Sequence, residues 1–292
     1  MPAFPLKRAG ANRLAGHWPH HLSLLGSHQI NREGNIMDLG LKGKNAIILG
    51  GTRGIGRAIA DTLAKEGTNV AVCARNTDQV AAAVADLKAL GVNATGASVD
   101  VTDGPALKKW IADAAGTLGG LDILISNAGA MAQGNDVAAW EQNFQLDVLA
   151  AVNAFEAAQP LLGKAAATNG DAAFVIISSI SAAQADRGDS YGPIKAALIH
   201  MAKGLARQHA KAGIRVNVVS PGMVFFEGGV WHTVKTNAPD FFEQANARNP
   251  TGRCATPQEI ANAAVFLASP ASSYTTGANL IVDGAVSNRV NF

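Results

Sequence analysis

The chain has 292 residues, of which 48% are hydrophobic, and this is enough apolar material for one large α/β domain or two smaller ones. Residues 1–36 hold four basic residues and one acidic residue, which leaves −1 of the net +2 for residues 37–292. That balance argues against a nucleic-acid binder, and because no apolar run approaches about 18 residues, we predict no membrane span. Two cysteines, Cys73 and Cys254, offer neither a disulfide framework nor a metal-ligand spacing, which indicates a reducing cytoplasm and no metal site.

Residues 1–36 differ in composition from the rest of the chain. They contain four of the seven histidines, together with prolines, and show no helical or strand period. A metal-binding tract and a transit peptide are alternatives, but composition favours a disordered extension. Arg32-Glu33-Gly34 can also be encoded by a purine-rich stretch of the kind that binds ribosomes, so Met37 is a candidate natural start. We expect residues 37–292 to form a single domain.

From residue 45 the chain alternates short β-branched runs with longer alanine-rich stretches. The runs predict strands at 45–50, 69–74, 94–99, 122–126, 173–178, 215–219 and 279–282, and the stretches predict helices at 55–66, 77–90, 104–118, 137–163, 191–212 and 257–268. Repeated β-α-β units with near-continuous apolar strands indicate a doubly wound α/β fold, in which helices cover both faces of a parallel sheet. Residues 221–256 are the least regular long stretch, and we predict a mobile lid there.

The junction between the first strand and the first helix is glycine-rich. Its glycines let the backbone turn tightly, so that a pyrophosphate can approach the N–H groups and the dipole at the helix start. The spacing is G-x-x-x-G-x-G rather than the commoner G-x-G-x-x-G, and a turn without a ligand is the alternative. In its strand-to-helix context the turn predicts a dinucleotide site made by Gly50, Thr52, Arg53, Gly54, Ile55 and Gly56.

The end of the second strand bears on the choice of cofactor. A carboxylate at this position would hold a ribose 2′-hydroxyl and repel a 2′-phosphate, whereas an arginine pairs with that phosphate. The strand ends in Arg75 and not in Asp or Glu, and Arg53 adds a second positive charge from the glycine turn. The pattern therefore favours NADP(H), with NAD(H) as the second choice; a solvated Arg75 is the alternative.

A tyrosine and a lysine stand four residues apart in the stretch SYGPIK, residues 190–195. On a helix Tyr191 and Lys195 share one face, and Pro193 is tolerated because an N–H in the first turn has no helical acceptor. An ammonium and an oxidised nicotinamide both favour the phenolate of a tyrosine, whose pKa is otherwise about 10, so the pair suits acid–base chemistry. The alternative is a tyrosine at a helix start followed by a solvated lysine.

Taken in order, these motifs resemble the short-chain dehydrogenase/reductase family. Besides the glycine turn, Tyr191 and Lys195, the ordered set contains Asn127-Ala128-Gly129, Ser179, Pro221-Gly222 and Val282-Asp283-Gly284, and the resemblance covers about residues 40–285. It implies a Rossmann-type sheet of seven strands in the order 3-2-1-4-5-6-7. It also implies that Asp100 and Val101 contact adenine, and that Asn127 to Gly129 pack beside the cofactor, as do Pro221 and Gly222.

The same resemblance selects a catalytic serine. In the family the hydroxyl comes from the second serine of Ile-Ser-Ser, which is Ser179 here, with Ser178 as the fallback. Neighbouring residues of a strand face opposite sides, so only one of the two can face the site. By resemblance Ser179 would hydrogen-bond the reacting oxygen, and Lys195 would also bind the nicotinamide ribose.

Two positions depart from the family pattern. Leu49 replaces the threonine that starts the glycine motif, which removes one bracing hydrogen bond worth about 1 kcal/mol. Asp147 stands where the family commonly has a catalytic asparagine that helps to hold a proton relay with the lysine. We expect Asp147 to be a relay member with altered pH dependence, with an ordinary helix residue as the alternative.

Aromatic residues gather in the predicted lid. Phe225, Phe226 and Trp231 follow Pro221-Gly222, where the family has its substrate loop, and Phe226 occupies the place of a threonine that binds the nicotinamide carboxamide. Such residues suit an apolar, ring-containing substrate, or they anchor the lid or a subunit interface.

The resemblance implies an NADP(H)-dependent oxidoreductase that interconverts a ketone or aldehyde with an alcohol. A 3-oxoacyl-thioester reductase and a non-catalytic NADP(H)-binding protein are the alternatives. Enoyl reductases of the family space tyrosine and lysine more widely. The family's habit of pairing its two long helices implies a homodimer or homotetramer, and we expect no nucleic-acid or membrane partner.

Overall fold

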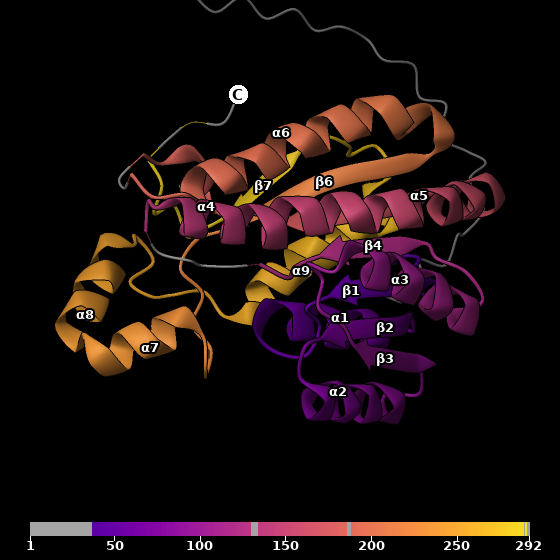
Figure 1. Cartoon of the computed structure of the whole chain (residues 1–292), viewed down its shortest axis with the longest axis horizontal. Helices are drawn as coiled ribbons and strands as arrows, with labels where there is room; N and C mark the ends of the chain where they lie inside the picture. Colours follow the sequence, from indigo (N-terminus) through magenta and orange to yellow (C-terminus); the bar gives the residue numbers. More distant parts are fainter. Residues whose placement is uncertain (1–36, 130–133, 186–187, 289, 291–292) are drawn as a thin grey trace, which may run out of the picture. The chain divides into compact units, whose positions relative to one another are not determined.

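The computed structural model describes residues 37–129, 134–185, 188–288 and 290, and within these ranges seven strands form one parallel sheet (Figure 1). The strands are β1 (Asn45–Leu49), β2 (Asn69–Ala74), β3 (Ala94–Ser98), β4 (Ile123–Ser126), β5 (Ala172–Ile177), β6 (Ile214–Pro221) and β7 (Asn279–Val282). Their order is β3-β2-β1-β4-β5-β6-β7, which confirms the predicted doubly wound Rossmann-type fold. The extension predicted for residues 1–36 lies outside the described residues.

Nine α-helices connect or flank these strands in the described part of the chain. They are α1 (Gly54–Lys65), α2 (Thr77–Ala89), α3 (Gly104–Leu118), α4 (Val137–Asn143), α5 (Ala150–Asn169), α6 (Tyr191–His209), α7 (Val230–Asn237), α8 (Pro239–Arg248) and α9 (Pro257–Ala268). Several begin at side-chain caps that satisfy first-turn N–H groups: Asn76 caps α2, Asp103 caps α3, and Thr256 with Glu259 forms a capping box on α9.

The prediction of one continuous helix over residues 137–163 is wrong. The chain forms α4, then a π-helical segment η1 (Phe144–Leu149), and then α5, which runs on to Asn169. A π turn is a rare, short widening inside an otherwise regular helical stretch, so a prediction that assumes one regular helix does not include it. The helix predicted over 191–212 is also shorter, because it changes at His209 to a 3₁₀ turn over Ala210–Ala212.

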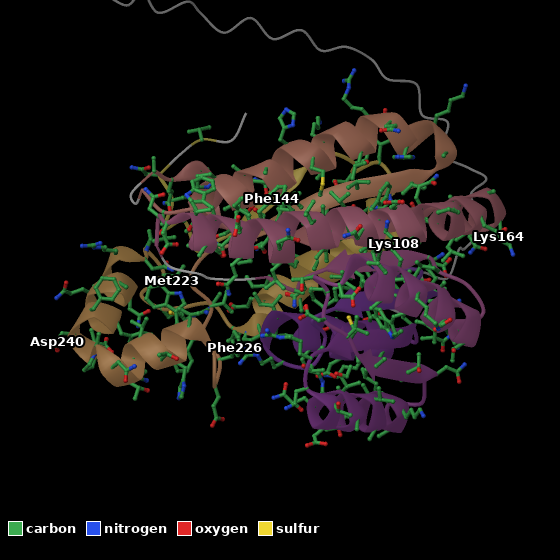
Figure 2. All side chains as sticks on the ribbon, viewed as in Figure 1. Lys108, Phe144, Lys164, Met223, Phe226 and Asp240 are labelled. Carbon is green, nitrogen blue, oxygen red and sulfur yellow. The ribbon has the colours of Figure 1, made fainter. Side chains whose placement is uncertain are left out.

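The lid stretch 221–256 is more regular than predicted, because it contains α7 and α8 (Figure 2). Gly229 precedes α7, and Pro239 occupies the first turn of α8, where a missing N–H costs nothing. A small core of its own holds the lid together: Met223, Phe242 and Cys254 are buried, with Phe225, Trp231, Val234 and Ala245 packed against them. The predicted mobility of this stretch stays a prediction.

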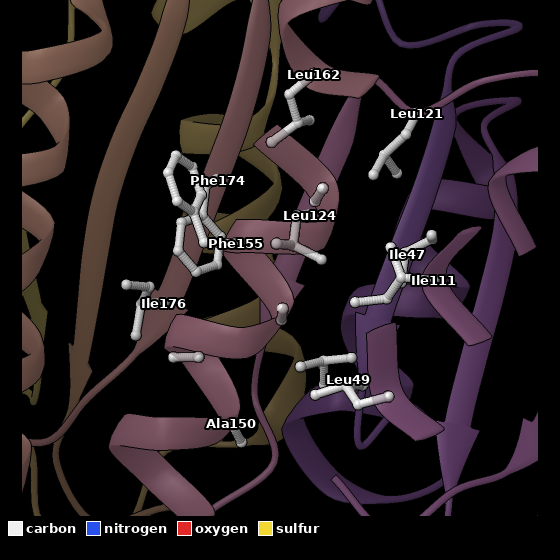
Figure 3. Packing of buried hydrophobic residues seen from close by; sticks show 14 of the residues in the cluster. Ile47, Leu49, Ile111, Leu121, Leu124, Ala150, Phe155, Leu162, Phe174 and Ile176 are labelled. Carbon is white, nitrogen blue, oxygen red and sulfur yellow. The ribbon is translucent and has the colours of Figure 1, made fainter. Parts of the chain in front are cut away.

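Two larger cores lie on the two faces of the sheet. In β1, Ile47 and Leu49 face the core that α3, α5 and α6 cover, whereas Ala46 and Ile48 face the core under α1, α2 and α9. Figure 3 shows the first of these cores, where Phe155 of α5 stacks on Phe174 of β5 with ring centroids 5.3 Å apart. Because both faces are covered, the strands are apolar almost throughout, as the sequence predicted.

One buried cation ties β6 to the end of α9. The Arg215 guanidinium pairs with the Asp171 carboxylate at 2.6 Å, and it also donates to the carbonyl oxygens of Leu267 and Ser269 at 2.6 and 3.0 Å. The arginine thus satisfies carbonyls that the end of the helix leaves without partners.

We predict that Arg215→Ala lowers the free energy of unfolding by about 3–5 kcal/mol, because the half-buried Asp171 would lose its counterion and the carbonyl groups would lose their buried donor. Chemical denaturation measures the change, and Arg207→Ala, which removes an exposed arginine from α6, is the matched control. Equal unfolding midpoints for the two variants would contradict the prediction.

Candidate active site and dinucleotide cleft

The glycine turn between β1 and α1 needs glycine for steric reasons. Gly50 and Gly54 have positive φ angles of 77° and 55°, a region that side chains disfavour. At Gly56 a Cβ atom would collide with the carbonyl oxygen of Gly50, and at Gly51 it would lie 2.5 Å from a Val72 methyl group. The turn is thus a close-packed unit in which the backbone itself forms the surface.

The start of α1 presents backbone donors. Arg53, the residue before the helix, makes no side-chain cap, and no residue in the described part of the chain accepts a hydrogen bond from the N–H groups of Gly54, Ile55 and Gly56. Unpaired N–H groups at the positive end of a helix dipole form a site for an anion. The turn can therefore hold a pyrophosphate, and the binding of one there stays a prediction.

The segment after β4 braces this turn and connects it to the second half of the site. The side-chain amide of Asn127 donates to the Gly50 carbonyl at 2.9 Å, and the Ala128 N–H donates to the Leu49 carbonyl at 2.8 Å. A Cβ on Gly129 would lie 2.7 Å from Asp147 Oδ1 and 3.1 Å from Lys195 Nζ. Glycine at 129 lets the backbone lie directly against that charged pair.

The residues predicted to meet the adenosine half follow two neighbouring strands, Arg75 after β2 and Asp100 with Val101 after β3. Arg75 is exposed, and its carbonyl oxygen accepts a hydrogen bond from the Ser98 hydroxyl at 2.8 Å. Hydrogen bonds from the backbone and hydroxyl of Thr102 lower the pKa of Asp100, and the charge of Arg75 lowers it further against the opposing effect of burial. Arg75 and Asp100 therefore lie near each other at the edge of the sheet, while Val101 is buried in the core.

Tyr191 and Lys195 begin α6, and their side chains meet. The Lys195 ammonium lies 5.5 Å from the centroid of the Tyr191 ring, 2.7 Å from Asp147 Oδ1 and 3.4 Å from the Ile177 carbonyl oxygen. Lys195 and Asp147 are buried, with exposed fractions of 5% and 2%. Burial opposes the charge on Lys195, but the charge of Tyr191, then that of Asp147 and its hydrogen bond, raise the pKa of Lys195 above its ordinary value. The lysine is therefore held as an ammonium ion.

The two serines after β5 have different environments. The Ser178 hydroxyl is buried and donates to the Lys195 carbonyl at 2.9 Å, so it anchors the first turn of α6. Ser179 is half-buried, and its Oγ accepts the Ser181 N–H at 3.1 Å, which leaves its own proton to donate. Ser179 thus keeps a hydroxyl proton to donate, and its catalytic role stays a prediction.

The three predicted substrate residues lie in two different places. The Phe226 ring lies against the glycine turn: a Cβ on Gly54 would be 2.5 Å from the end of that ring. Figure 2 shows Phe226 between the lid helices and α1. Phe225 and Trp231 instead pack on Phe242 inside the lid, with centroids 5.7 and 6.3 Å apart.

Two further contacts lie near the glycine turn and at the end of β6: one joins the turn to the lid, and the other joins the ends of β6 and β7. Arg53 donates from Nη1 to the Gly228 carbonyl at 3.0 Å, so this predicted phosphate ligand also holds the lid. Pro221 ends β6, and a Cβ on Gly222 would lie 2.8 Å from the Asp283 side chain, so glycine allows the two segments to approach. The Thr52 hydroxyl points to Gln79 of α2 at 3.4 Å.

Sequence analysis did not single out Asn143, the last residue of α4. It is buried, and its side-chain amide donates to the Ser190 hydroxyl at 2.8 Å, directly before Tyr191. The only signal in the sequence was a polar residue one turn ahead of Asp147.

Neither a metal cluster nor a membrane-spanning helix is found among the residues that the structure describes. No group of three or more His, Cys, Asp or Glu side chains there is arranged to hold a metal ion. No described helix is long and apolar enough to cross a bilayer.

Comparison with known proteins covers most of the chain. Residues 50–287 match a family model described as Enoyl-(Acyl carrier protein) reductase. Isoepoxydon dehydrogenase patN of Penicillium expansum is 36% identical over 258 residues, which are 86% of this chain and 97% of the relative. The rhamnolipids biosynthesis 3-oxoacyl-(acyl-carrier-protein) reductase of Pseudomonas aeruginosa is 33% identical over 84% of this chain and 96% of its own. The 2,5-dichloro-2,5-cyclohexadiene-1,4-diol dehydrogenase LinX of Sphingobium indicum is 33% identical, with the same coverage.

Solved structures agree with these relatives. L-Sorbose reductase from Gluconobacter frateurii, complexed with NADPH and L-sorbose, superposes with a TM-score of 0.78 at 31% identity, over 87% of this chain and 100% of that one. A 7α-hydroxysteroid dehydrogenase complexed with NADH and 7-oxo glycochenodeoxycholic acid also reaches a TM-score of 0.78, at 31% identity over 87% of this chain and 98% of its own.

Proposed function

Because the chain belongs to the short-chain dehydrogenase/reductase family, we propose that it is an NADP(H)-dependent enzyme that interconverts an apolar, ring-containing ketone or aldehyde with its alcohol. An oxidoreductase acting on CH–OH and C=O groups is already established by that membership. The observation that carries the proposal is the buried Lys195–Asp147 pair beside the Tyr191 ring, which Gly129 connects to the phosphate-binding turn.

The proposed reaction divides the work among three side chains. Tyr191 donates its phenolic proton to the carbonyl oxygen in reduction and receives it back in oxidation. Ser179 donates a hydrogen bond to the same oxygen while negative charge develops on it. Lys195 holds positive charge near the phenol, and Asp147 keeps that charge in place. When bound, the nicotinamide supplies the hydride for the carbonyl carbon.

The cofactor assignment rests on the described residues of the cleft. The N–H groups at the start of α1 would hold the pyrophosphate, and Arg75 with Arg53 would hold a 2′-phosphate. No carboxylate ends β2 in the place where NAD(H) enzymes hold the ribose hydroxyls, which favours NADP(H). Asp100 with Val101 for adenine, and Asn127, Ala128, Gly129, Pro221 and Gly222 along the cleft, complete the proposal.

The substrate class is supported by the lid and by two relatives. Phe226 places an apolar ring beside the glycine turn, and Phe225 and Trp231 belong to the aromatic core of the lid. The cyclohexadiene diol and hydroxysteroid dehydrogenases act on compounds whose names state a ring. The second candidate is a 3-oxoacyl-thioester reductase, which the relative from Pseudomonas aeruginosa favours.

We further propose a cytoplasmic homodimer or homotetramer that uses α5 and α6 as its contact surface. Several large apolar side chains along α4, η1 and α5 are exposed: Val137, Trp140, Phe144 and Val152. Exposed apolar side chains that gather along consecutive helical segments are typical of a subunit interface.

The function is tested with named probes. Wild-type protein is expected to reduce cyclohexanone faster with NADPH than with NADH, and Tyr191→Phe should lower kcat by about 10²-fold or more because the proton donor is lost. Absorbance of the reduced nicotinamide follows the reaction. Binding of NADPH without turnover of either cyclohexanone or acetoacetyl-coenzyme A would contradict the proposal, and a higher kcat/KM for the thioester would favour the second candidate.

Cofactor preference is tested by reversing one charge. Arg75→Asp should raise the KM for NADPH about tenfold or more, because a charge-assisted hydrogen bond to phosphate becomes a repulsion, and it should lower the KM for NADH. Lys65→Asp, the same reversal at the far end of α1, is the control. An unchanged ratio of the two KM values would remove Arg75 from the cofactor site.

The role of Asp147 is tested by replacing its carboxylate with an amide. Asp147→Asn removes the carboxylate that compensates the Lys195 charge, so the ammonium then stabilises a phenolate more strongly. The midpoint of the pH–rate profile for cyclohexanol oxidation with NADP⁺ should fall by about one unit, equivalent to about 1.4 kcal/mol. Glu156→Gln, which neutralises an exposed carboxylate on α5, should leave the profile in place. An identical profile in both variants excludes Asp147 from the reaction.

A further inference from the structure

A second buried contact holds the residue directly before Tyr191. The side-chain amide of Asn143, at the end of α4, donates to the Ser190 hydroxyl at 2.8 Å. Both residues have an exposed fraction of 0%. This hydrogen bond joins segments 47 residues apart in the sequence, and it lies one residue from the proposed proton donor.

Ser190 directly precedes α6 but does not cap it with its side chain. A serine directly before a helix ordinarily turns its hydroxyl toward the N–H groups of the first turn. Ser190 instead has helical dihedral angles, φ −73° and ψ −22°, and makes no side-chain cap. Asp189 accepts the Tyr191 N–H at 3.2 Å in its place. The serine hydroxyl is thus directed away from its own helix and toward α4.

The same stretch of chain also holds Lys195. Asn143 ends α4, η1 begins at the next residue, and Asp147 within η1 pairs with the lysine. Two side chains four residues apart therefore contact Ser190 and Lys195, which are five residues apart. Tyr191 stands between these two contacts, so its backbone is held from both sides.

We propose that Asn143 is a positioning residue that, through Ser190, sets the place of the Tyr191 phenol relative to Lys195. The assignment deepens the proposed function and rests on it for its catalytic meaning, because it is the proton donor that is positioned. Asp147 and Ser178 secure the lysine end of the same turn, at its side chain and its carbonyl respectively.

The chain offers a readout that needs no substrate. It has two tyrosines, Tyr191 and the fully exposed Tyr274, so in a Tyr274→Phe background the ultraviolet absorbance of tyrosinate follows Tyr191 alone. Among the described residues, the charged groups around Tyr191 are Lys195 and Asp147, with Asp189 at its backbone N–H, and the variants below leave all three unchanged.

Three variants and one control are compared in that background. Asn143→Leu removes the amide donor at similar volume, and Ser190→Ala removes the hydroxyl acceptor. The double variant completes a double-mutant cycle. The control is Asn169→Leu at the C-terminal end of α5. This variant loses the hydrogen bond from the Asn169 amide to Asp122, which is also 2.8 Å long. Unfolding by denaturant identifies any variant that fails to fold.

A displaced phenol loses the support of the ammonium, so the Tyr191 titration midpoint should rise by about one pH unit in Asn143→Leu and in Ser190→Ala. The double variant should rise no further, because both single variants break the same contact. The kcat for cyclohexanone with NADPH should fall about tenfold at nearly constant KM, and the control should change neither quantity.

A midpoint and a kcat that match those of the Asn169→Leu control would overturn the proposal. Additive shifts in the double variant would also overturn it, because the two residues would then act independently. Failure of the proposed function is a separate outcome: Tyr191→Phe would keep its turnover, while the titration would still decide whether Asn143 positions the phenol.

Discussion

The buried pair of Lys195 and Asp147 is the interaction on which the arrangement of the site depends. Removing an ammonium and a carboxylate from water costs several kcal/mol each, and only close pairing with additional hydrogen bonds compensates for it. The 2.7 Å contact supplies the pairing, and the Ile177 carbonyl accepts a further, longer bond at 3.4 Å from the lysine. The start of α6 is thereby held against η1 and the end of β5, and Tyr191, one turn earlier, has little freedom to be elsewhere.

The pair also determines the local charge. In the family pattern an uncharged asparagine would leave the lysine as a lone cation, whereas here the carboxylate balances it. The positive field that reaches the phenol is correspondingly smaller, although the lysine itself is held more firmly in its charged form. A substitution that looks conservative in size therefore changes the electrostatics of the proposed proton transfer.

Parallel strands bring the remaining parts of the site together. The carboxyl ends of β1, β4, β5 and β6 meet at one edge of the sheet, so the glycine turn, Asn127, Ser179 and Pro221 become neighbours although they span more than half of the described chain. The lid reaches this edge through two contacts, the Phe226 ring on Gly54 and the Arg53 bond to Gly228. Its own aromatic core is separate from the two cores on the faces of the sheet.

Local patterns in the sequence determined the strands, most of the helices, the glycine turn and the facing of Tyr191 and Lys195, because each depends on residues close together in the chain. Tertiary structure decided the rest. The π turn after Asn143 is a rare feature inside a long helical stretch, and the lid helices are short, with 8 and 10 residues, so both were missed. Asp147 meets Lys195, and Ser190 turns to Asn143 instead of capping its helix, only because α4 and η1 pack on α6. Likewise, the Ser178 hydroxyl donates to the Lys195 carbonyl only because the end of β5 lies against α6.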